Sequence, residues 1–286
     1  MRAGRRDVPI THPDKVLFPD DGITKADLAA YYRDAAPQMV PLVTDRPVSM
    51  QRYNAGIARG GFFQKNLPKG APGWLRTATV AKRDGTVTHP LVTDAAALVW
   101  LANQNCITPH VWPARADRPD RPDRMIFDLD PSDDDFGLVR RSALTLGEIL
   151  RTAGVEPWAM TTGSRGLHVV VALRRRHGFT AVRDAAVAIG EELVARNPGE
   201  LTLAFLKKKR GGRLYVDVNR NGYAATAVAP FGVRARPGAP VATPLRWEEL
   251  EDLGLTPGRW TLRDVLDRDP GAWASVPTAA GPLPRT

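Results

Sequence analysis

Two aspartates on alternate residues of an apolar run constrain the possible folds of this chain more than any other sequence feature. The run from Met125 to Pro131 (MIFDLDP) has the composition of a β-strand. Alternate side chains of a strand point to the same face of a sheet, so Asp128 and Asp130 share a face and repel each other. A divalent cation relieves such repulsion, because hard cations take carboxylate oxygens as ligands. Two solvated acids at a strand end remain the alternative for this pair alone.

The charge of the chain indicates a polyanionic partner. The 286 residues carry a net charge of +9 and a pI near 10.0, which suits nucleic acid or an anionic membrane surface. The first 18 residues lack the apolar core of a signal peptide, and no apolar stretch approaches the ~20 residues that cross a bilayer. The single cysteine, Cys106, lies in an apolar context and predicts a small buried packing residue in a reducing cytoplasm.

The pattern along the chain predicts an α+β fold with a mixed or antiparallel central sheet. Thr24 opens a helix with a capping-type start, and the apolar spacing carries this helix to Pro37. Residues 46–92 are expected to form hairpins, and 113–124 an extended loop. Further helices are expected over 93–103, 136–153 and 179–196, and strands near 157–162, 167–173, 201–206, 213–218 and 224–231. We expect one domain over 1–270 and a flexible tail over 271–286.

A glycine-bracketed turn between two apolar strands, TTGSRGLH over 161–168, is the second chemical signal. Its glycines free backbone N–H groups, and Thr162, Ser164, Arg165 and His168 add donors, a combination suited to phosphate oxygens. The turn lacks the Gly-Lys-Ser/Thr step of a Walker A motif. A tight hairpin with a solvated arginine is the alternative.

A single acid in another apolar strand, Asp217 in LYVDV, is the third signal. A buried acid needs a partner or a metal. A third carboxylate would complete a two-metal site, in which two cations hold the attacking and leaving oxygens. An edge-strand acid that faces water is the alternative.

Basic and aromatic residues add weaker signals. Lys207 to Arg210 form a basic run that favours phosphate contacts or is a solvated face. Phe62 and Phe63, between two glycines and Lys65, suit stacking of a base beside a phosphate, although one of the two rings is expected in the core. Lys82-Arg83-Asp84-Gly85 matches the K-x-D-G pattern of ATP-dependent ligases, but we interpret it as a hairpin turn. The triplet 133–135 (DDD) is expected to cap the helix that begins near Phe136.

The order DLDP, TTGSRGLH and VDV resembles the archaeo-eukaryotic primase superfamily, and more narrowly the polymerase domain of bacterial ligase D. The resemblance runs from about residue 11 to about 265, with support from the segments HPDKVLFP, GITKADLAAYY, GGFFQKN, NQNCITPHVWP and VAPFGVRARPGAPVATPLRWEEL. It implies a primase-polymerase fold with a smaller N-terminal α/β subdomain.

The resemblance also implies site residues. It assigns metal binding to Asp128, Asp130 and Asp217, and an active-site role to His110 that is left open between metal and substrate. It assigns the incoming nucleotide to Lys65, Thr162, Arg165, His168, Arg220 and Arg234, and we add Ser164 from its place in the turn. It assigns a 5′-phosphate and the DNA to Lys15, Lys25 and Phe62, beside Phe63. The family often has serine where this chain has Thr162, which keeps the hydroxyl.

The resulting hypothesis is a nucleotidyltransferase that adds nucleotides to a 3′-OH at gaps or double-strand break ends in DNA repair. The resemblance implies two divalent metals (Mn²⁺ or Mg²⁺), NTP or dNTP substrates with ribonucleotides preferred, and 5′-phosphorylated DNA as partner in the bacterial nucleoid, without a membrane. No motif of a ligase or phosphoesterase domain is seen, so we expect a stand-alone polymerase with a separate ATP-dependent ligase and a Ku-type end-binding protein, or an excised domain. The alternatives are a primer-synthesising primase, a hydrolytic phosphodiesterase and a non-catalytic DNA-end binding module.

Overall fold

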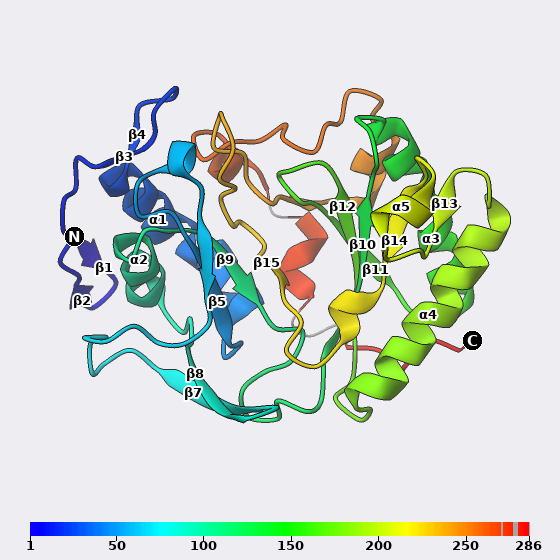
Figure 1. Cartoon of the computed structure of the whole chain (residues 1–286), viewed down its shortest axis with the longest axis horizontal. Helices are drawn as coiled ribbons and strands as arrows, with labels where there is room; N and C mark the ends of the chain where they lie inside the picture. The colour runs from blue at the N-terminus through cyan, green and yellow to red at the C-terminus, as the bar shows by residue number, and fades with distance from the viewer. Residues whose placement is uncertain (270, 277–279, 286) are drawn as a thin grey trace. The chain divides into compact units, whose positions relative to one another are not determined.

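The computed structural model describes residues 1–269, 271–276 and 280–285, which form two compact units interleaved along the sequence. Unit 1 consists of 1–119, 226–242 and 260–269, and unit 2 of 120–225, 243–259 and 270–286. The elements of both units are labelled in Figure 1. None of the helices in the described ranges has the length and apolar character needed to cross a bilayer.

Unit 2 is built on a six-stranded sheet in the order β13-β14-β10-β12-β11-β16, in which only the β13–β14 pair is parallel. This is the mixed, largely antiparallel sheet that the sequence predicts. The elements of unit 2 are β10 (Arg124–Asp130), α3 (Phe136–Thr152), β11 (Pro157–Thr161), β12 (Leu167–Ala172), α4 (Phe179–Arg196), β13 (Leu201–Thr202), α5 (Lys207–Arg210), β14 (Leu214–Asp217), η2 (Asn219–Asn221), β16 (Pro244–Leu245), η3 (Trp247–Glu251) and η5 (Gly271–Ser275).

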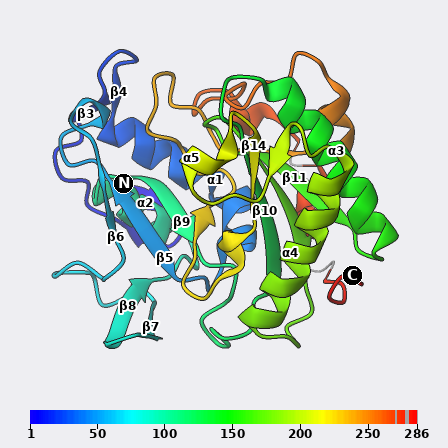
Figure 2. The ribbon, with the colours of Figure 1, turned by 45° about the vertical axis from the view of Figure 1, so that its right-hand side comes forward.

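The two faces of this sheet differ because side chains alternate along each strand. In β10, Phe127 and Leu129 are fully buried, whereas Asp128 and Asp130 lie on the other face and are less buried. Helices α3 and α4 lie side by side along the sheet (Figure 2) and contact β10, β11, β12 and β13. Because an apolar face must be covered, the helices shield the face that carries Phe127, and the opposite face is left for the acids.

Unit 1 contains a four-stranded sheet in the order β15-β9-β5-β6, two packed helices and three hairpins. Its elements are β1 (Arg2–Ala3), β2 (Arg6–Asp7), β3 (Val16–Phe18), β4 (Ile23–Thr24), α1 (Lys25–Val43), β5 (Val48–Arg52), η1 (Ile57–Arg59), β6 (Phe62–Gln64), β7 (Thr77–Lys82), β8 (Gly85–Pro90), α2 (Ala95–Asn103), β9 (Cys106–Val111), β15 (Ala227–Val228) and η4 (Val265–Asp267).

Local sequence signals explain most element boundaries. Thr24 and Asp27 form a capping box at the start of α1, and Asp135 caps α3 by accepting a hydrogen bond from the Leu138 amide. Lys82 and Gly85 face each other across the β7–β8 hairpin, so the K-x-D-G segment is a turn, as predicted. Cys106 is fully buried, and its burial raises the pKa of the thiol to about 12.

The predicted end of the first helix at Pro37 is wrong, because α1 continues through Pro37 and Pro41 to Val43. A proline removes one backbone donor, but burial of the later apolar positions, Met39 and Leu42 among them, offsets that loss. Two strands are also shorter than predicted: β13 ends at Thr202 rather than near 206, and β15 covers only Ala227–Val228.

The single domain over 1–270 and the flexible tail over 271–286 stay predictions. Within that tail, Trp273 is fully buried and donates from its indole Nε1 to the Ala159 carbonyl at 2.8 Å. Gly281 forms a parallel bridge with Leu173. Residues 277–279 and 286 lie outside the described residues.

The side chain of the fully buried Asn221 forms hydrogen bonds to the backbone of β10 at a position where β14 no longer lies beside it. Strand β14 ends at Asp217, and beyond it the Asn221 side chain accepts from the Ile126 amide at 2.8 Å and donates to the Ile126 and Val218 carbonyls at 2.8 and 2.9 Å. These three hydrogen bonds fix η2 against the strand that carries the acids, because buried backbone groups must be paired.

Replacement of Asn221 by alanine is expected to lower the free energy of unfolding by about 2–3 kcal/mol, because it leaves two buried groups of Ile126 without partners. Urea unfolding of Asn221→Ala measures the loss. Thr145→Ala, which removes an exposed side-chain hydrogen bond, is the control and should change stability by less than about 0.5 kcal/mol. Equal losses in the two variants would contradict this account of η2.

Candidate active site

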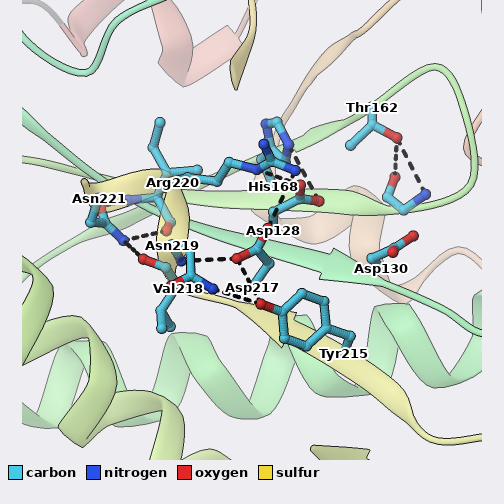
Figure 3. A network of polar contacts seen from close by, with 12 residues as sticks. Asp128, Asp130, Thr162, His168, Tyr215, Asp217, Val218, Asn219, Arg220 and Asn221 are labelled. Carbon is cyan, nitrogen blue, oxygen red and sulfur yellow. Dashed lines mark hydrogen bonds and ion pairs between the residues drawn. The ribbon is translucent and has the colours of Figure 1, made fainter. Parts of the chain in front are cut away.

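The three acids that the sequence singled out converge on the open face of the unit 2 sheet. Asp128 on β10 lies directly opposite Asp217 on β14, and Asp130 lies opposite Tyr215. Opposed residues of an antiparallel pair point to the same face, so all three carboxylates share it (Figure 3). The side chains of Asp128 and Asp217 are only 14% and 10% exposed, so their charges need partners.

Arg220 forms an ion pair with both Asp128 and Asp217. Its Nε lies 3.1 Å from Asp128 Oδ2, and its Nη2 lies 3.3 Å from Asp217 Oδ2. The second Asp128 oxygen lies 3.4 Å from His168 Nε2 on the neighbouring strand β12. One guanidinium therefore neutralises two carboxylates that would otherwise repel each other across the ladder.

The pKa of Asp128 reflects these opposing effects. Burial by itself raises the pKa of a carboxyl group, because it penalises the charged form. The charges of His168 and Arg220 and their hydrogen bonds outweigh burial, so the pKa of Asp128 lies well below its usual range. The group is ionised at neutral pH, as a metal or phosphoryl-transfer site requires.

The remaining carboxylate oxygens are also engaged. Asp217 Oδ1 accepts from the Tyr215 hydroxyl at 3.0 Å and from the Asn219 amide at 2.9 Å. Asp130 lies 3.4 Å from Arg165 and 3.3 Å from Arg210. All six oxygens of the three acids therefore contact a donor supplied by the chain itself.

This donor set fits hard divalent cations, because three clustered carboxylates offer oxygen ligands of the kind that Mg²⁺ and Mn²⁺ accept. Within the described ranges, however, no group of three acidic, histidine or cysteine side chains is arranged to hold a metal ion. Arginine side chains lie against oxygens of all three acids.

The glycine-bracketed turn joins β11 to β12 and lies next to Asp130. The Thr162 hydroxyl accepts from the amides of Ser164 and Gly166 at 3.3 and 3.2 Å and donates to the Gly166 carbonyl at 3.0 Å, so it orders the turn from within. A Cβ on Gly166 would lie 2.1 Å from the Leu129 carbonyl oxygen, which explains why glycine is needed there. Arg165 and Ser164 project from this turn.

A second group of predicted residues lies in unit 1. Lys15 donates to the Asn54 carbonyl, and the buried Lys25 donates to the Thr11 and Asn103 carbonyls at 2.8 and 3.3 Å. Burial, Lys15 and Arg52 together lower the pKa of Lys25. A hollow of about 520 Å³ beside them is lined by residues that include Lys15. Uncompensated positive charge of this kind attracts an anion.

Both predicted phenylalanines are exposed, and neither is a core residue. Phe62 and Phe63 on β6 are 46% and 53% exposed. The Arg52 guanidinium lies 5.7 Å from the Phe62 ring centre, and Phe63 contacts the His110 ring edge-on at 5.0 Å. Phe62 is thereby connected through Arg52 to the lysine pair.

The predicted residues are thus divided between the units. Unit 2 brings together Asp128, Asp130, Thr162, Ser164, Arg165, His168, Asp217 and Arg220. Unit 1 carries Lys15, Lys25, Phe62, Phe63, Lys65, His110 and Arg234. Lys65 is exposed after β6, His110 is half-buried on β9 opposite Ser49, and Arg234 is half-buried after β15.

Sequence reasoning missed three residues that contact the predicted ones. Arg210 was grouped with a basic run, although its guanidinium lies against both Asp130 and the Tyr215 ring. Tyr215 could have been found, because it lies two residues before Asp217 and so shares its face. Arg52 gave no local signal, since its partners are distant in sequence.

The sequence and the fold of this chain are similar to those of known proteins. The family model of the LigD primase-polymerase domain matches residues 24–270. The chain belongs to this family. It is therefore a DNA-directed nucleotidyltransferase of the primase-polymerase type, with the fold that the sequence resemblance implied.

Individual relatives agree with the family. The chain is 33% identical over 267 residues to the multifunctional non-homologous end joining protein LigD of Mycolicibacterium smegmatis, covering 91% of this chain and 34% of the relative. It is 30% identical to the bifunctional LigD of Bacillus subtilis, covering 90% of this chain and 42% of the relative. The chain thus spans well under half the length of these relatives.

A solved structure matches most of the chain. The polymerase domain of Mycobacterium tuberculosis ligase D, in complex with DNA, superposes with a TM-score of 0.89 at 31% identity. The match covers 96% of this chain and 99% of that one.

Replacement of Arg220 by glutamine is expected to leave Asp128 and Asp217 repelling each other. We expect the metal-free protein to lose about 1–2 kcal/mol of stability, a value reduced for the partial exposure of the guanidinium. Mn²⁺ should then raise the melting temperature of Arg220→Gln more than that of wild type, because the cation replaces the lost charge. Melting in chelator and in MnCl₂ measures both effects.

The control for this prediction is Arg196→Gln, which removes a guanidinium that pairs with Glu192 on the surface of α4. It should respond to Mn²⁺ as wild type does. An identical Mn²⁺ shift in wild type and Arg220→Gln would contradict the role given to Arg220.

Proposed function

We propose that this chain adds nucleotides, preferentially ribonucleotides, to a DNA 3′-OH at gaps or double-strand break ends in DNA repair. The observation that carries the proposal is the convergence of Asp128, Asp130 and Asp217 on one sheet face, beside phosphate-type donors, in a chain of the LigD primase-polymerase family. The preference for ribonucleotides rests on the family resemblance.

The three acids would hold two divalent metals, Mn²⁺ or Mg²⁺. When bound, such metals lower the pKa of the attacking 3′-OH and stabilise charge on the transferred phosphoryl group. Asp128, ionised because of its depressed pKa, is ready to bind a cation without first losing a proton. Tyr215 and the Asn219 amide hold the Asp217 carboxylate in a fixed orientation.

The cationic side chains around the acids would bind the triphosphate. Arg165, His168 and Arg220 all contact the acids and can exchange a carboxylate for a phosphate, since both are anions recognised by the same donors. Ser164 and the backbone amides of the Thr162 turn add hydrogen-bond donors. We assign Lys65, Arg234 and His110 of unit 1 to the nucleotide as well, following the resemblance.

The DNA end would be bound by unit 1. Lys15 and Lys25 are proposed to bind the 5′-phosphate of a recessed end, with Phe62 and Phe63 supporting the DNA. The cation cluster with Arg52, its lowered Lys25 pKa and the exposed rings support this assignment. The related ligase D domain was solved in complex with DNA, which also favours a DNA partner. A separate ATP-dependent ligase and a Ku-type protein are proposed as further partners in the nucleoid.

Loss of the acid pair is expected to abolish nucleotide addition. Extension of a gapped, 5′-phosphorylated duplex by Asp128→Ala/Asp130→Ala should fall roughly a thousandfold, because metal catalysis supplies several kcal/mol. Running NTP and dNTP in parallel measures sugar preference, and omitting the primer tests for primer synthesis. Asp133→Ala/Asp134→Ala is the matched control and should extend as wild type does.

Extension that survives in Asp128→Ala/Asp130→Ala would overturn the assignment of the acids. Binding of the duplex without extension by wild type would favour the end-binding module. Shortened DNA without pyrophosphate would indicate a phosphodiesterase.

The 5′-phosphate should matter for binding only while the lysine pair is intact. Wild type should bind a recessed 5′-phosphorylated duplex about tenfold more tightly than the unphosphorylated one, as charged hydrogen bonds allow. Lys15→Ala/Lys25→Ala should bind the two duplexes equally. Lys15→Gln is a second variant that keeps the buried Lys25 contacts, and Lys69→Ala/Lys82→Ala controls for loss of charge. Equal binding of the two duplexes by wild type would exclude this phosphate site.

A further inference from the structure

The end of the unit 2 sheet that lies away from the acids carries a second concentration of positive charge. Strand β12 ends at Ala172, opposite Arg124, whereas Asp128 lies opposite His168. Ala172 is therefore four residues along the strand from His168, or about 14 Å at the usual rise of a strand. The residues after Ala172 and Leu173 are Arg174-Arg175-Arg176-His177, which none of the site assignments uses.

The main chain of this segment is held in place. The Leu173 amide donates to the Asp123 carbonyl at 2.8 Å, and the Arg174 amide donates to the Gly281 carbonyl at 2.7 Å. Arg121 Nη1 donates to the Arg176 carbonyl at 3.2 Å. The arginines thus project from a fixed turn and not from a loose loop.

Among the residues that the structure describes, Arg174 and Arg176 have no ion-pair partner. Arg174, Arg176 and His177 are exposed, and Arg121 beside them pairs with Asp120 at 3.2 Å. One exposed arginine needs no explanation, since a charged residue on the surface is solvated. Two exposed arginines within three residues repel each other, and a polyanion relieves that repulsion. We call Arg121, Arg174, Arg176 and His177 the arginine edge.

An aromatic pair, the half-buried Phe179 and the exposed Tyr223, adjoins the arginine edge. Phe179 begins α4 two residues after His177, and its ring meets Tyr223 edge-on at 5.6 Å between ring centres. Tyr223 is 44% exposed and follows η2, the segment that Asn221 ties to β10. Tyr223 therefore offers ring surface to solvent from a position fixed relative to the catalytic strands.

Cations beside an exposed ring suit a single nucleic-acid strand. Arginines bind its phosphates, and an aromatic ring stacks on an unpaired base. Duplex DNA offers the same phosphates but no free base face, and an acidic protein offers charge without a base. We propose that the arginine edge and Tyr223 bind the single-stranded extension of a DNA end whose terminus is at the acids.

This proposal rests on the proposed function, because it takes the acids as the place where the 3′ end reacts. It also predicts a minimum length of the single-stranded extension for binding to the arginine edge. The end of β12 lies about 14 Å from His168, so a strand at about 3.4 Å per stacked nucleotide must be longer than about four nucleotides to reach the arginine edge beyond it. Longer extensions gain contacts there, and shorter ones do not.

Fluorescence anisotropy with labelled duplexes tests the proposal. The duplexes carry no extension or extensions of two, four, eight and twelve nucleotides, and each is measured over a range of salt concentrations. For wild type we expect affinity to rise once the extension exceeds about four nucleotides. Arg174→Gln/Arg176→Gln should bind the eight- and twelve-nucleotide extensions about tenfold more weakly and lower the salt slope by about 1.4, from roughly 0.7 per phosphate contact. Its binding of blunt duplex should not change.

Two further variants separate stacking from charge. Tyr223→Ala should lose several-fold affinity for long extensions, and Tyr223→Phe should keep it, because the ring and not the hydroxyl stacks. Arg141→Gln/Arg196→Gln removes the same charge from the surfaces of α3 and α4 and should bind every duplex as wild type does. Oligo(dT) should compete for the site far better than polyglutamate of equal charge.

The outcomes are distinguishable from failure of the proposed function. Affinity that does not depend on extension length, or equal losses in Arg174→Gln/Arg176→Gln and Arg141→Gln/Arg196→Gln, would overturn the arginine edge. Equal competition by polyglutamate would overturn it in favour of an acidic protein. In each case the extension assay on a gapped duplex, to which the arginine edge is not assigned, still reports whether the chain is a polymerase.

Discussion

The pairing of β10 with β14 places two buried carboxylates directly opposite each other, and the site depends on how that repulsion is relieved. Asp128 and Asp217 face each other across the ladder, where like charges destabilise a sheet. Arg220 forms an ion pair with each of the two and so balances part of their repulsion. The chain itself therefore supplies the positive charge that relieves the repulsion, from a guanidinium that lies against carboxylate oxygens of both acids.

The third acid, Asp130, is also paired with arginines, and these come from separate segments of the chain. Asp130 pairs with Arg165 from the β11–β12 turn and with Arg210 from α5. Each counter-ion thus belongs to a different segment around β10. Under the proposed function, substrate phosphates would compete for the same guanidinium groups, so that binding of the triphosphate would release the acids by exchange of one anion for another.

Lys15, Lys25 and Arg52 of unit 1 differ from the arginines around the acids of unit 2 in that they contact backbone carbonyls and not carboxylates. In the part of the chain that the structure describes, no carboxylate lies within 4 Å of Lys15, Lys25 or Arg52 as an ion-pair partner. Backbone carbonyls fix these cations in position and leave their charge available. The three acids of unit 2 are therefore neutralised by arginines of the same unit, whereas these cations of unit 1 contact neutral oxygen atoms and add to the net positive charge of the chain.

The sequence by itself determined what depends on local periodicity. Alternation placed Asp128 and Asp130 on one face, capping residues set the starts of α1 and α3, and glycines marked the turn after Thr161. Only the tertiary structure decided that Asp217 lies opposite Asp128 and that Arg220 bridges them, because strand register and ion pairing depend on residues distant in sequence. Likewise, packing carried α1 past Pro37, where propensity alone predicts an end. Local chemistry determined which residues can act, and long-range packing decided which of them meet.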